Sequence, residues 1–438
     1  MMDPATLATI VLVVGIVIGL AFSVPIGISI GVPSFLAMIV VVGDGWLAAE
    51  NSASRMFTGI NNFTLLAIPF FVLAGVIMNK GGIAGRLVDA AKVLVGRMPA
   101  GLAQTNVAAN AMFGAVSGAA VAAAAAVGQV MHPRLVKDGY KPSWAAAVNV
   151  ASAPAGMLVP PSNTFIVFSL VSSTSIAALF MAGVGPGLVW IVAVMVVVWF
   201  TYRSNRLADA TEEQHPTLKQ ALLVIWRAIP SLFMIFLVVG GILIGWFTAT
   251  ESSAIAVAYC LVLSFIYRTV KVREIPGILI EAGRTTAIVM LLVGVSSILS
   301  FVMSFANIPQ MISDALLGFT DSQTVILIIM MIILLAVGTF MDPTPAILIF
   351  VPMFIGIIDQ FGIDRVHFGT MIVYNLSVGV ITPPVGNVLF VGTRVAGVRL
   401  EPVIGKLLWF LLAIILGLFV VVFVPQISLW LPTALGLL

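Results

Sequence analysis

Long apolar segments separated by short polar ones fill almost the whole chain. Twelve such runs can be drawn, at residues 6–24, 25–42, 62–79, 102–131, 143–176, 177–202, 229–247, 252–267, 283–305, 322–352, 366–396 and 405–424. A membrane-spanning helix needs about 20 mainly apolar residues. The pattern therefore predicts an all-α polytopic membrane protein.

Composition supports this class. Of the 438 residues, 61% are hydrophobic and 8% are charged, whereas soluble domains carry roughly 25% charged residues. The length allows about ten to twelve spans. A net charge of +3, without a basic run interleaved with aromatic residues, does not indicate a nucleic-acid partner. The single cysteine, Cys260, excludes an intrachain disulfide.

Two of the long runs contain a Pro-Pro pair with a glycine four residues before it. The first is Gly156 with Pro160-Pro161, and the second is Gly379 with Pro383-Pro384. Proline donates no backbone hydrogen bond and disfavours helix in the preceding residue, so each pair should break its helix. Broken helices in hydrocarbon are tolerated where they are buried or line a cavity. Two breaks in matching places therefore indicate a transporter binding site.

The two halves of the chain are similar. The most polar stretch, 203–220, lies in the expected cytoplasmic linker at 203–228, between a first repeat at 1–202 and a second at 229–438. Leu12-Val13-Val14-Gly15 recurs as Leu237-Val238-Val239-Gly240, 225 positions later (237 − 12). The glycines at 114 and 338 are 224 apart, and the prolines at 160 and 383 are 223 apart. Three ordered matches at nearly one offset predict an internal duplication.

Runs 102–131 and 322–352 are long for one span and short for two, because two spans need about 40 residues. The first is interrupted by glycines and a serine at 114–118, and the second by the Gly- and Pro-rich stretch 338–345. We expect each to form a re-entrant helical hairpin whose two half-helices meet at that tip. The alternative is a single long kinked helix.

The basic residues predict the topology. If both hairpins enter and leave the membrane on the same side, each half has five crossings. Because five is an odd number, the second half is inverted relative to the first. Placing the N-terminus outside puts all but Arg55 and Arg365 in cytoplasmic segments, which is 18 of the 20 Lys and Arg residues (20 − 2). This bias follows the positive-inside rule and places both termini in the periplasm. Residues 81–97 should form an interfacial amphipathic arm, with 309–318 as its weaker counterpart.

Intramembrane polar side chains gather at the two tips and the two breaks. They are Ser117, Ser162, Asn163, Thr164, Thr339, Asp342, Thr344, Thr382 and Asn387. The two asparagines follow the breaks in matching places and are costly to bury, which favours a binding role. Asp342 is either functional or a cap of the following half-helix. Arg394 is either a substrate contact or an ordinary positive anchor, and Glu251 should be a helix cap or an anchor near the outer end of a helix.

Unwound backbone at such breaks exposes carbonyl oxygens, which together with Ser, Thr, Asn and Asp oxygens suit a hard cation. Half-helix N-termini suit a carboxylate. The pattern thus predicts coupled Na⁺ and organic-anion binding. Ser117, Asn163, Asn387 and Arg394 are the candidate substrate contacts.

Signatures of catalysis are missing from the sequence, so we expect no enzyme and no organic cofactor. There is no P-loop to use ATP, no metalloprotease pair and no dinucleotide fingerprint. His132, His215 and His367 fall in predicted loops far apart, which does not indicate a metal cluster.

Several stretches together resemble the large membrane subunit of tripartite ATP-independent periplasmic (TRAP) transporters, the DctM-like family. They are Ile68-Pro69-Phe70-Phe71-Val72-Leu73-Ala74-Gly75, Phe113-Gly114-Ala115-Val116-Ser117-Gly118, Thr248-Ala249-Thr250-Glu251, Gly338-Thr339-Phe340-Met341-Asp342 and Pro383-Pro384-Val385-Gly386-Asn387-Val388-Leu389-Phe390-Val391. The resemblance implies an elevator-type transporter of the ion-transporter superfamily in a bacterial inner membrane. It would be driven by Na⁺, fed by a periplasmic binding protein and attached to a small four-helix membrane subunit.

The resemblance also implies two sodium sites, one in each half, each made by a hairpin tip and a Pro-Pro break. The candidate residues are Gly114, Ser117, Gly118, Pro160, Ser162 and Asn163 in the first site, and Gly338, Thr339, Asp342, Thr382, Pro383, Gly386 and Asn387 in the second. An alternative is a stand-alone dicarboxylate or citrate symporter of the same superfamily. A channel or proton-driven antiporter is a third hypothesis, disfavoured because the membrane segments hold few acids and no histidine.

Overall fold

The computed structural model describes residues 3–22, 24–206, 218–320 and 322–438. Within this part of the chain the secondary structure is helical, apart from one isolated bridge between Tyr140 and Arg206. Eight described helices are long and apolar enough to cross a membrane, or nine if the bent pair around Pro160 is one span. The predicted class, an all-α polytopic membrane protein, is confirmed. The number of long spans is below the ten to twelve expected because α1 and α2 contain shorter apolar stretches.

The helices of the first half run from the N-terminus to the polar linker. They are α1 (Pro4–Ala21), α2 (Ile26–Val42), α3 (Gly45–Ile60), α4 (Ala67–Lys80), α5 (Ile83–Val95), α6 (Gly101–Ser117), α7 (Ala120–Lys137), α8 (Pro142–Ser152), α9 (Ala155–Leu158), α10 (Asn163–Ser172) and α11 (Ile176–Thr201). Short 3₁₀ turns at Phe63–Leu66 and Arg203–Asn205 accompany them.

The second half repeats this general order. Its helices are α12 (Leu218–Leu243), α13 (Ala249–Ile266), α14 (Ile275–Phe305), α15 (Ile308–Phe319), α16 (Gln323–Phe340), α17 (Pro343–Gln360), α18 (Arg365–Gly379), α19 (Asn387–Ala396), α20 (Leu400–Phe423) and α21 (Gln426–Ala434). A 3₁₀ turn at Val272–Glu274 precedes α14.

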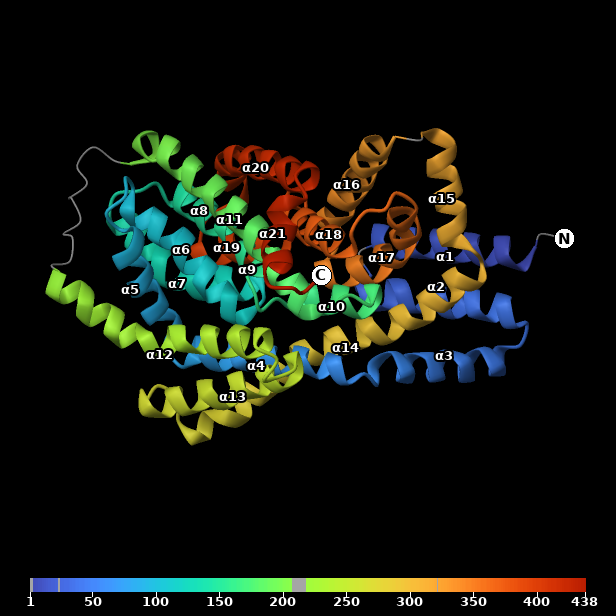
Figure 1. The fold of residues 1–438 in the computed structure, drawn as a ribbon, viewed down its shortest axis with the longest axis horizontal. Helices are drawn as coiled ribbons and strands as arrows, with labels where there is room; N and C mark the ends of the chain where they lie inside the picture. The colour runs from blue at the N-terminus through green and yellow to red at the C-terminus, as the bar shows by residue number, and fades with distance from the viewer. Residues whose placement is uncertain (1–2, 23, 207–217, 321) are drawn as a thin grey trace.

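Two groups of helices pack against each other, and the remaining helices pack around them (Figure 1). One group holds α4, α13 and α14, with α2 and α3 packed along α14 and α1 packed on α2. The other holds the hairpins α6–α7 and α16–α17 and the broken helices α8–α10 and α18–α19. Within it, α7 packs against α19 and α17 packs against α10. Each hairpin therefore contacts the broken helix of the opposite half, which brings both tips and both breaks together.

Both Pro-Pro pairs break their helices as predicted. The first break separates α9 from α10 and bends the path by 42°. The second leaves residues 380–386 non-helical between α18 and α19. Both Pro-Pro peptide bonds are cis. Each break thus exposes backbone polar groups in the interior of a helical protein.

Both predicted hairpins form, but their arms are longer than expected. The first runs from Gly101 to Lys137 and the second from Gln323 to Gln360, against predicted ranges of 102–131 and 322–352. The helices continue past His132-Pro133 and past Pro352 because those prolines are accommodated inside α7 and α17. The side of the membrane from which each hairpin opens stays a prediction.

One boundary and two helices differ from the sequence prediction. The linker at 203–228 is too long, because α12 already begins at Leu218; residues 207–217 lie outside the described part of the chain. Helix α3 was not predicted because its 16 residues include several polar ones. The short α21 after α20 was also missed. The amphipathic arms do form helices, α5 and α15, and their position at the membrane interface stays a prediction.

Helix α13 begins with a capping box, in agreement with the sequence prediction for Glu251. The Thr248 hydroxyl accepts from the backbone N–H of Glu251 at 3.2 Å, and the Glu251 carboxylate accepts from the backbone N–H of Thr248 at 2.8 Å. We expect Thr248→Val to lower the stability of the protein by about 1 kcal/mol, because one helix N-terminus loses its cap. Thermal unfolding in detergent measures this effect. The exposed Thr433→Val is the matched control, and an equal loss there would contradict a specific capping role.

Candidate ion and substrate site

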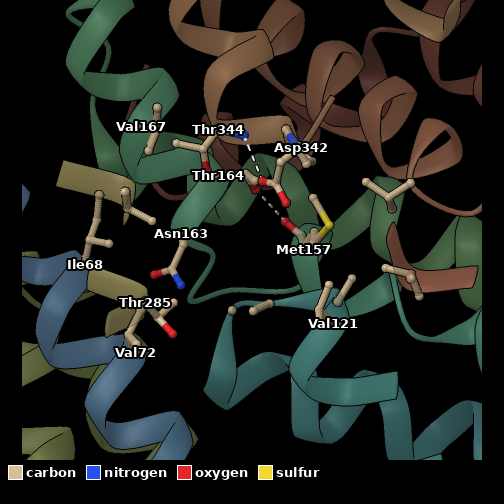
Figure 2. Close-up of a pocket in the computed structure, with 17 residues that line it drawn as sticks. Ile68, Val72, Val121, Met157, Asn163, Thr164, Val167, Thr285, Asp342 and Thr344 are labelled. Atoms are coloured by element: carbon tan, nitrogen blue, oxygen red, sulfur yellow. Dashed lines mark hydrogen bonds between the residues drawn. The ribbon is translucent and has the colours of Figure 1, made fainter. Parts of the chain in front are cut away.

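A cavity of about 300 Å³ lies where the tips, the breaks and two further helices meet. Its lining residues come from five places: α4, the first tip, the first break, α14, and the second tip with its break. They are Ile68, Val72, Gly118, Ala119, Ala120, Val121, Met157, Asn163, Thr164, Val167, Thr285, Val289, Asp342, Pro343, Thr344, Val380 and Val388 (Figure 2). The cavity is therefore enclosed by both halves of the chain and by both helix groups.

The first tip lies directly against the first break. Gly118 ends α6 with φ +61°, a left-handed conformation that favours glycine. A Cβ atom at this position would lie 3.1 Å from the Asn163 backbone nitrogen and 3.1 Å from the Pro161 carbonyl oxygen. The left-handed turn and the close approach both explain why this position is a glycine. The contact places the tip beside the start of α10.

Asn163 is the first residue of α10, and its side chain extends toward Thr285 and Val72 (Figure 2). Its Oδ1 atom is buried and has no hydrogen-bond partner within the described structure. A buried unpaired amide oxygen is costly. Since amide oxygens are suitable cation ligands, the missing partner is consistent with a bound ion.

The tip of the second hairpin carries an acidic residue, Asp342. Asp342 caps α17, because its carboxylate accepts from the Thr344 backbone N–H at 3.3 Å (Figure 2). The Asn387 side chain lies near the same carboxylate. Across the break, the Gly386 N–H donates to the Thr339 carbonyl at 3.2 Å. The tip and break of the second half are therefore joined by side-chain and backbone contacts.

The second break also gathers backbone oxygens. Gly386 has φ +53°, and a Cβ there would lie 3.1 Å from the Thr382 carbonyl oxygen and 3.2 Å from that of Val380. Both carbonyls thus lie close to Gly386, the residue before Asn387, and the Val380 carbonyl also accepts from the Val388 N–H at 3.0 Å. Such an oxygen-rich, partly unwound segment suits a hard monovalent cation.

A pair of glycines packs each hairpin onto the broken helix of its own half. In the first half, a Cβ on Gly114 would overlap the Gly156 backbone. In the second, a Cβ on Gly379 would lie 2.6 Å from the Gly338 Cα. The pairs correspond at sequence offsets of 224 and 223 (338 − 114 and 379 − 156). The same close approach of backbones thus supports both sides of the cavity.

Four half-helices, α7, α10, α17 and α19, begin at the tips and breaks around the cavity. Ala119 and Ser162 are the N-cap residues of α7 and α10, and neither side chain caps its helix. The N-terminus of α17 is already capped by Asp342. The positive ends of α7 and α10 therefore carry no side-chain cap. The end of α19 has none either, but its Val388 N–H already donates to the Val380 carbonyl at 3.0 Å.

The predicted site residues divide into three groups. Gly118, Asn163 and Asp342 line the cavity. A second group lies within the surrounding tips and breaks: Gly114, Ser117, Pro160, Ser162, Gly338, Thr339, Thr382, Pro383, Gly386 and Asn387. Arg394 forms the third group, since it is exposed in the last turn of α19 and does not line the cavity. This placement supports the anchoring interpretation of Arg394.

Several hydroxyls near the breaks have local partners. The Ser162 hydroxyl donates to the Met157 carbonyl at 2.5 Å and is 2.7 Å from the Thr164 hydroxyl. The Thr339 hydroxyl donates to the Ala336 carbonyl of its own helix, and the Thr382 hydroxyl donates to the Val378 carbonyl at the end of α18, at 2.7 Å each. Such bonds within a helix are common for Ser and Thr. These hydroxyls therefore already have hydrogen-bond partners within the chain.

The sequence prediction missed Thr285 and the aliphatic part of the wall. Thr285 and Val289 lie on α14, and Ile68 and Val72 lie on α4. Apolar residues in a membrane helix carry no motif that separates a cavity wall from a lipid-facing surface. The only available signal was that Ile68 begins one of the family-like stretches.

The described part of the chain does not support a metal site built from His, Cys, Asp or Glu side chains. The described residues contain no group of three or more His, Cys, Asp or Glu side chains that could hold a metal ion. The prediction that His132 and His367 lie in loops is wrong, because they are within α7 and α18. His215 lies outside the described residues.

The architecture defines the class: a polytopic helical transporter with a cavity between paired hairpin tips and broken helices. The family profile described as "Tripartite ATP-independent periplasmic transporter, DctM component" matches residues 13–427. The chain belongs to this family. Protein YgiK of Salmonella typhimurium, described as uncharacterized, is 47% identical over 415 residues, 94% of each chain.

Two further similarities extend this result. The C4-dicarboxylate TRAP transporter large permease protein DctM of Pseudomonas aeruginosa is 35% identical over 410 residues, 93% of this chain and 95% of that protein. The YdaH transporter of Alcanivorax borkumensis, whose crystal structure has an unusual topology, aligns with a TM-score of 0.61 at 13% identity. That alignment covers 89% of this chain and 90% of the YdaH chain, and it supports the fold alone.

Proposed function

We propose that this chain is the large permease subunit of a TRAP transporter that takes up an organic acid anion together with Na⁺. The observation that carries the proposal is the cavity lined by both tips and both breaks. Ligand sites at paired broken helices are typical of secondary transporters.

Sodium is supported by the oxygens around the cavity. Asp342 is the only ionisable side chain among the described residues that line it. The unpaired Oδ1 of Asn163 and the backbone oxygens beside Gly386 add neutral ligands. A carboxylate with several amide and carbonyl oxygens suits a hard cation. We assign one sodium ion to each tip and break.

The anion is supported by the helix N-termini and by Asn163. The uncapped ends of α7 and α10 carry partial positive charge, and their first-turn N–H groups point away from the helix. An Asn amide provides a donor as well as an acceptor. Asn163 can therefore bind the carboxylate through Nδ2 and a sodium ion through Oδ1, which would couple the two ligands.

Transport would follow from movement of one helix group against the other. The tips and breaks belong to one group, whereas Ile68, Val72, Thr285 and Val289 come from α4 and α14 of the other. A site at such an interface can pass from one side of the membrane to the other if the hairpin group moves as a body. This is the elevator mechanism, operating in a bacterial inner membrane with both termini periplasmic.

Uptake by the complete transporter tests coupling and partners. The proposal places a small membrane subunit and a periplasmic substrate-binding protein with this chain. Proteoliposomes holding all three should accumulate the organic anion only with an inward Na⁺ gradient and with the binding protein. Equal uptake with K⁺ in place of Na⁺ would refute the coupling. Uptake without the binding protein would instead favour a stand-alone symporter.

Asn163→Ala is expected to weaken Na⁺ binding about tenfold, because it removes a neutral oxygen ligand worth about 1.4 kcal/mol. Asn387→Ala should act in the same direction. The Na⁺ concentration that raises the melting temperature of the purified chain measures the effect. Asn51→Ala on the exposed side of α3 is the control. Unchanged Na⁺ dependence in both asparagine variants would refute their assignment as ligands.

A further inference from the structure

The wall of the cavity is mostly aliphatic. Eight of its side chains are branched aliphatic residues or methionine: Ile68, Val72, Val121, Met157, Val167, Val289, Val380 and Val388. The described lining contains no Lys or Arg, and Arg394 lies at the exposed end of α19. The polar groups are confined to the tips, the breaks and Thr285. A ligand here would meet polar groups at one end and apolar surface over the rest of its body.

Charge in the cavity favours a single carboxylate on the ligand. One carboxylate can lie at the uncapped N-termini of α7 and α10, next to Asn163. The N-terminus of α17 already has its anion, Asp342. The N-terminus of α19 also has no side-chain cap, but its Val388 N–H donates to the Val380 carbonyl at 3.0 Å. Its first residue, Asn387, lies near Asp342. A second ligand carboxylate would therefore face either the Asp342 carboxylate or the aliphatic wall. Burying an unpaired charge against apolar surface is strongly unfavourable.

We propose that the substrate is a monocarboxylate with an apolar, aliphatic body, and that dicarboxylates bind poorly. The inference rests on the proposed function, since it names the substrate class of the same cavity. The carboxylate lies at the starts of α7 and α10, and the aliphatic body lies between α4, α14 and Val121. One relative is named for C4-dicarboxylates, so membership of the family does not by itself predict a monocarboxylate substrate.

A homologous series of acids tests the proposal on the purified chain in lipid nanodiscs, with Na⁺ present. Propanoate, butanoate and pentanoate are compared by the rise in melting temperature at increasing concentration. Each added methylene should tighten binding about fourfold, the equivalent of about 0.8 kcal/mol of burial. Butanoate should bind at least about tenfold tighter than succinate, which has the same four carbons and a second carboxylate.

A matched pair of valine variants places the effect in the cavity. Val121 and Val136 both lie on α7 and have similar exposures of 38% and 37%, but only Val121 lines the cavity. Val121→Thr keeps the side-chain shape and adds a hydroxyl, so it should weaken pentanoate binding about fivefold. Val136→Thr should leave it unchanged. Equal effects of the two variants would overturn the proposed location of the aliphatic body.

The outcomes separate this inference from the function on which it rests. Na⁺-dependent binding of succinate at least as tight as that of butanoate overturns the monocarboxylate preference and leaves the organic-anion function standing. An affinity that does not rise with chain length also overturns it. No Na⁺-dependent binding of any acid in the series overturns both proposals.

Discussion

Asp342→Asn is expected to weaken Na⁺ binding about 30-fold, because a hydrogen-bonded or ion-bound charge contributes about 2 kcal/mol. The substitution removes the one charge in the described cavity wall and changes the side-chain volume very little. Asparagine is also a good N-cap, so α17 should keep its start at Pro343. The Na⁺ dependence of the melting temperature measures the affinity.

Asp359→Asn is the matched control for this prediction. Asp359 lies in the last turn of the same helix, outside the cavity, and forms an exposed ion pair with Arg365 at 2.6 Å. Exposed ion pairs contribute about 0–1 kcal/mol. The control should therefore retain wild-type Na⁺ affinity. Wild-type affinity in Asp342→Asn as well would show that the acid is only a helix cap.

Gly156→Ala is expected to destabilise the protein by about 3 kcal/mol or to prevent folding. The added Cβ would overlap the backbone of Gly114, and a backbone atom cannot move aside by changing rotamer. Relief would require α6 and α9 to separate, which would displace the first tip from the first break. The folded yield and melting temperature in detergent measure this effect.

Gly356→Ala is the control for the glycine prediction. Gly356 lies inside α17 with open space where a Cβ would be, so alanine should be neutral or stabilising by up to about 1 kcal/mol. Gly379→Ala, the counterpart in the second half, should behave like Gly156→Ala because its Cβ would meet Gly338. If Gly156→Ala and Gly379→Ala were as stable as Gly356→Ala, that result would contradict the close backbone contact between each hairpin and the broken helix of its own half.

The sequence predicted the breaks and tips well because each is set by local chemistry. Proline interrupts a helix wherever it lies, so Pro160 and Pro383 marked the breaks before any packing was known. Glycine at 118 and Asp342 marked the tips in the same way. Residues with special backbone roles are therefore visible in one sequence.

The cavity wall could not be predicted because it depends on which helices pack together. Ile68 and Val289 lie in ordinary apolar helices, and only the contact of α4 and α14 with the hairpin group makes them part of the site. The sequence favoured an anchoring role for Arg394 without excluding a substrate contact, because its orientation depends on the length of α19 after the break. Helix α3 was missed because its mixed sequence resembles a loop more than a span.

The most direct test of the central claim measures access to the cavity with a single cysteine. Ala119→Cys places a thiol in the lining at the first tip, and the natural Cys260 is buried. The account predicts that Na⁺ together with a bound organic acid slows maleimide labelling at position 119, and that K⁺ does not. Val136→Cys, outside the cavity, should label at one rate throughout. A labelling rate at position 119 that is the same with and without Na⁺ and the anion would contradict a transport site between the two tips.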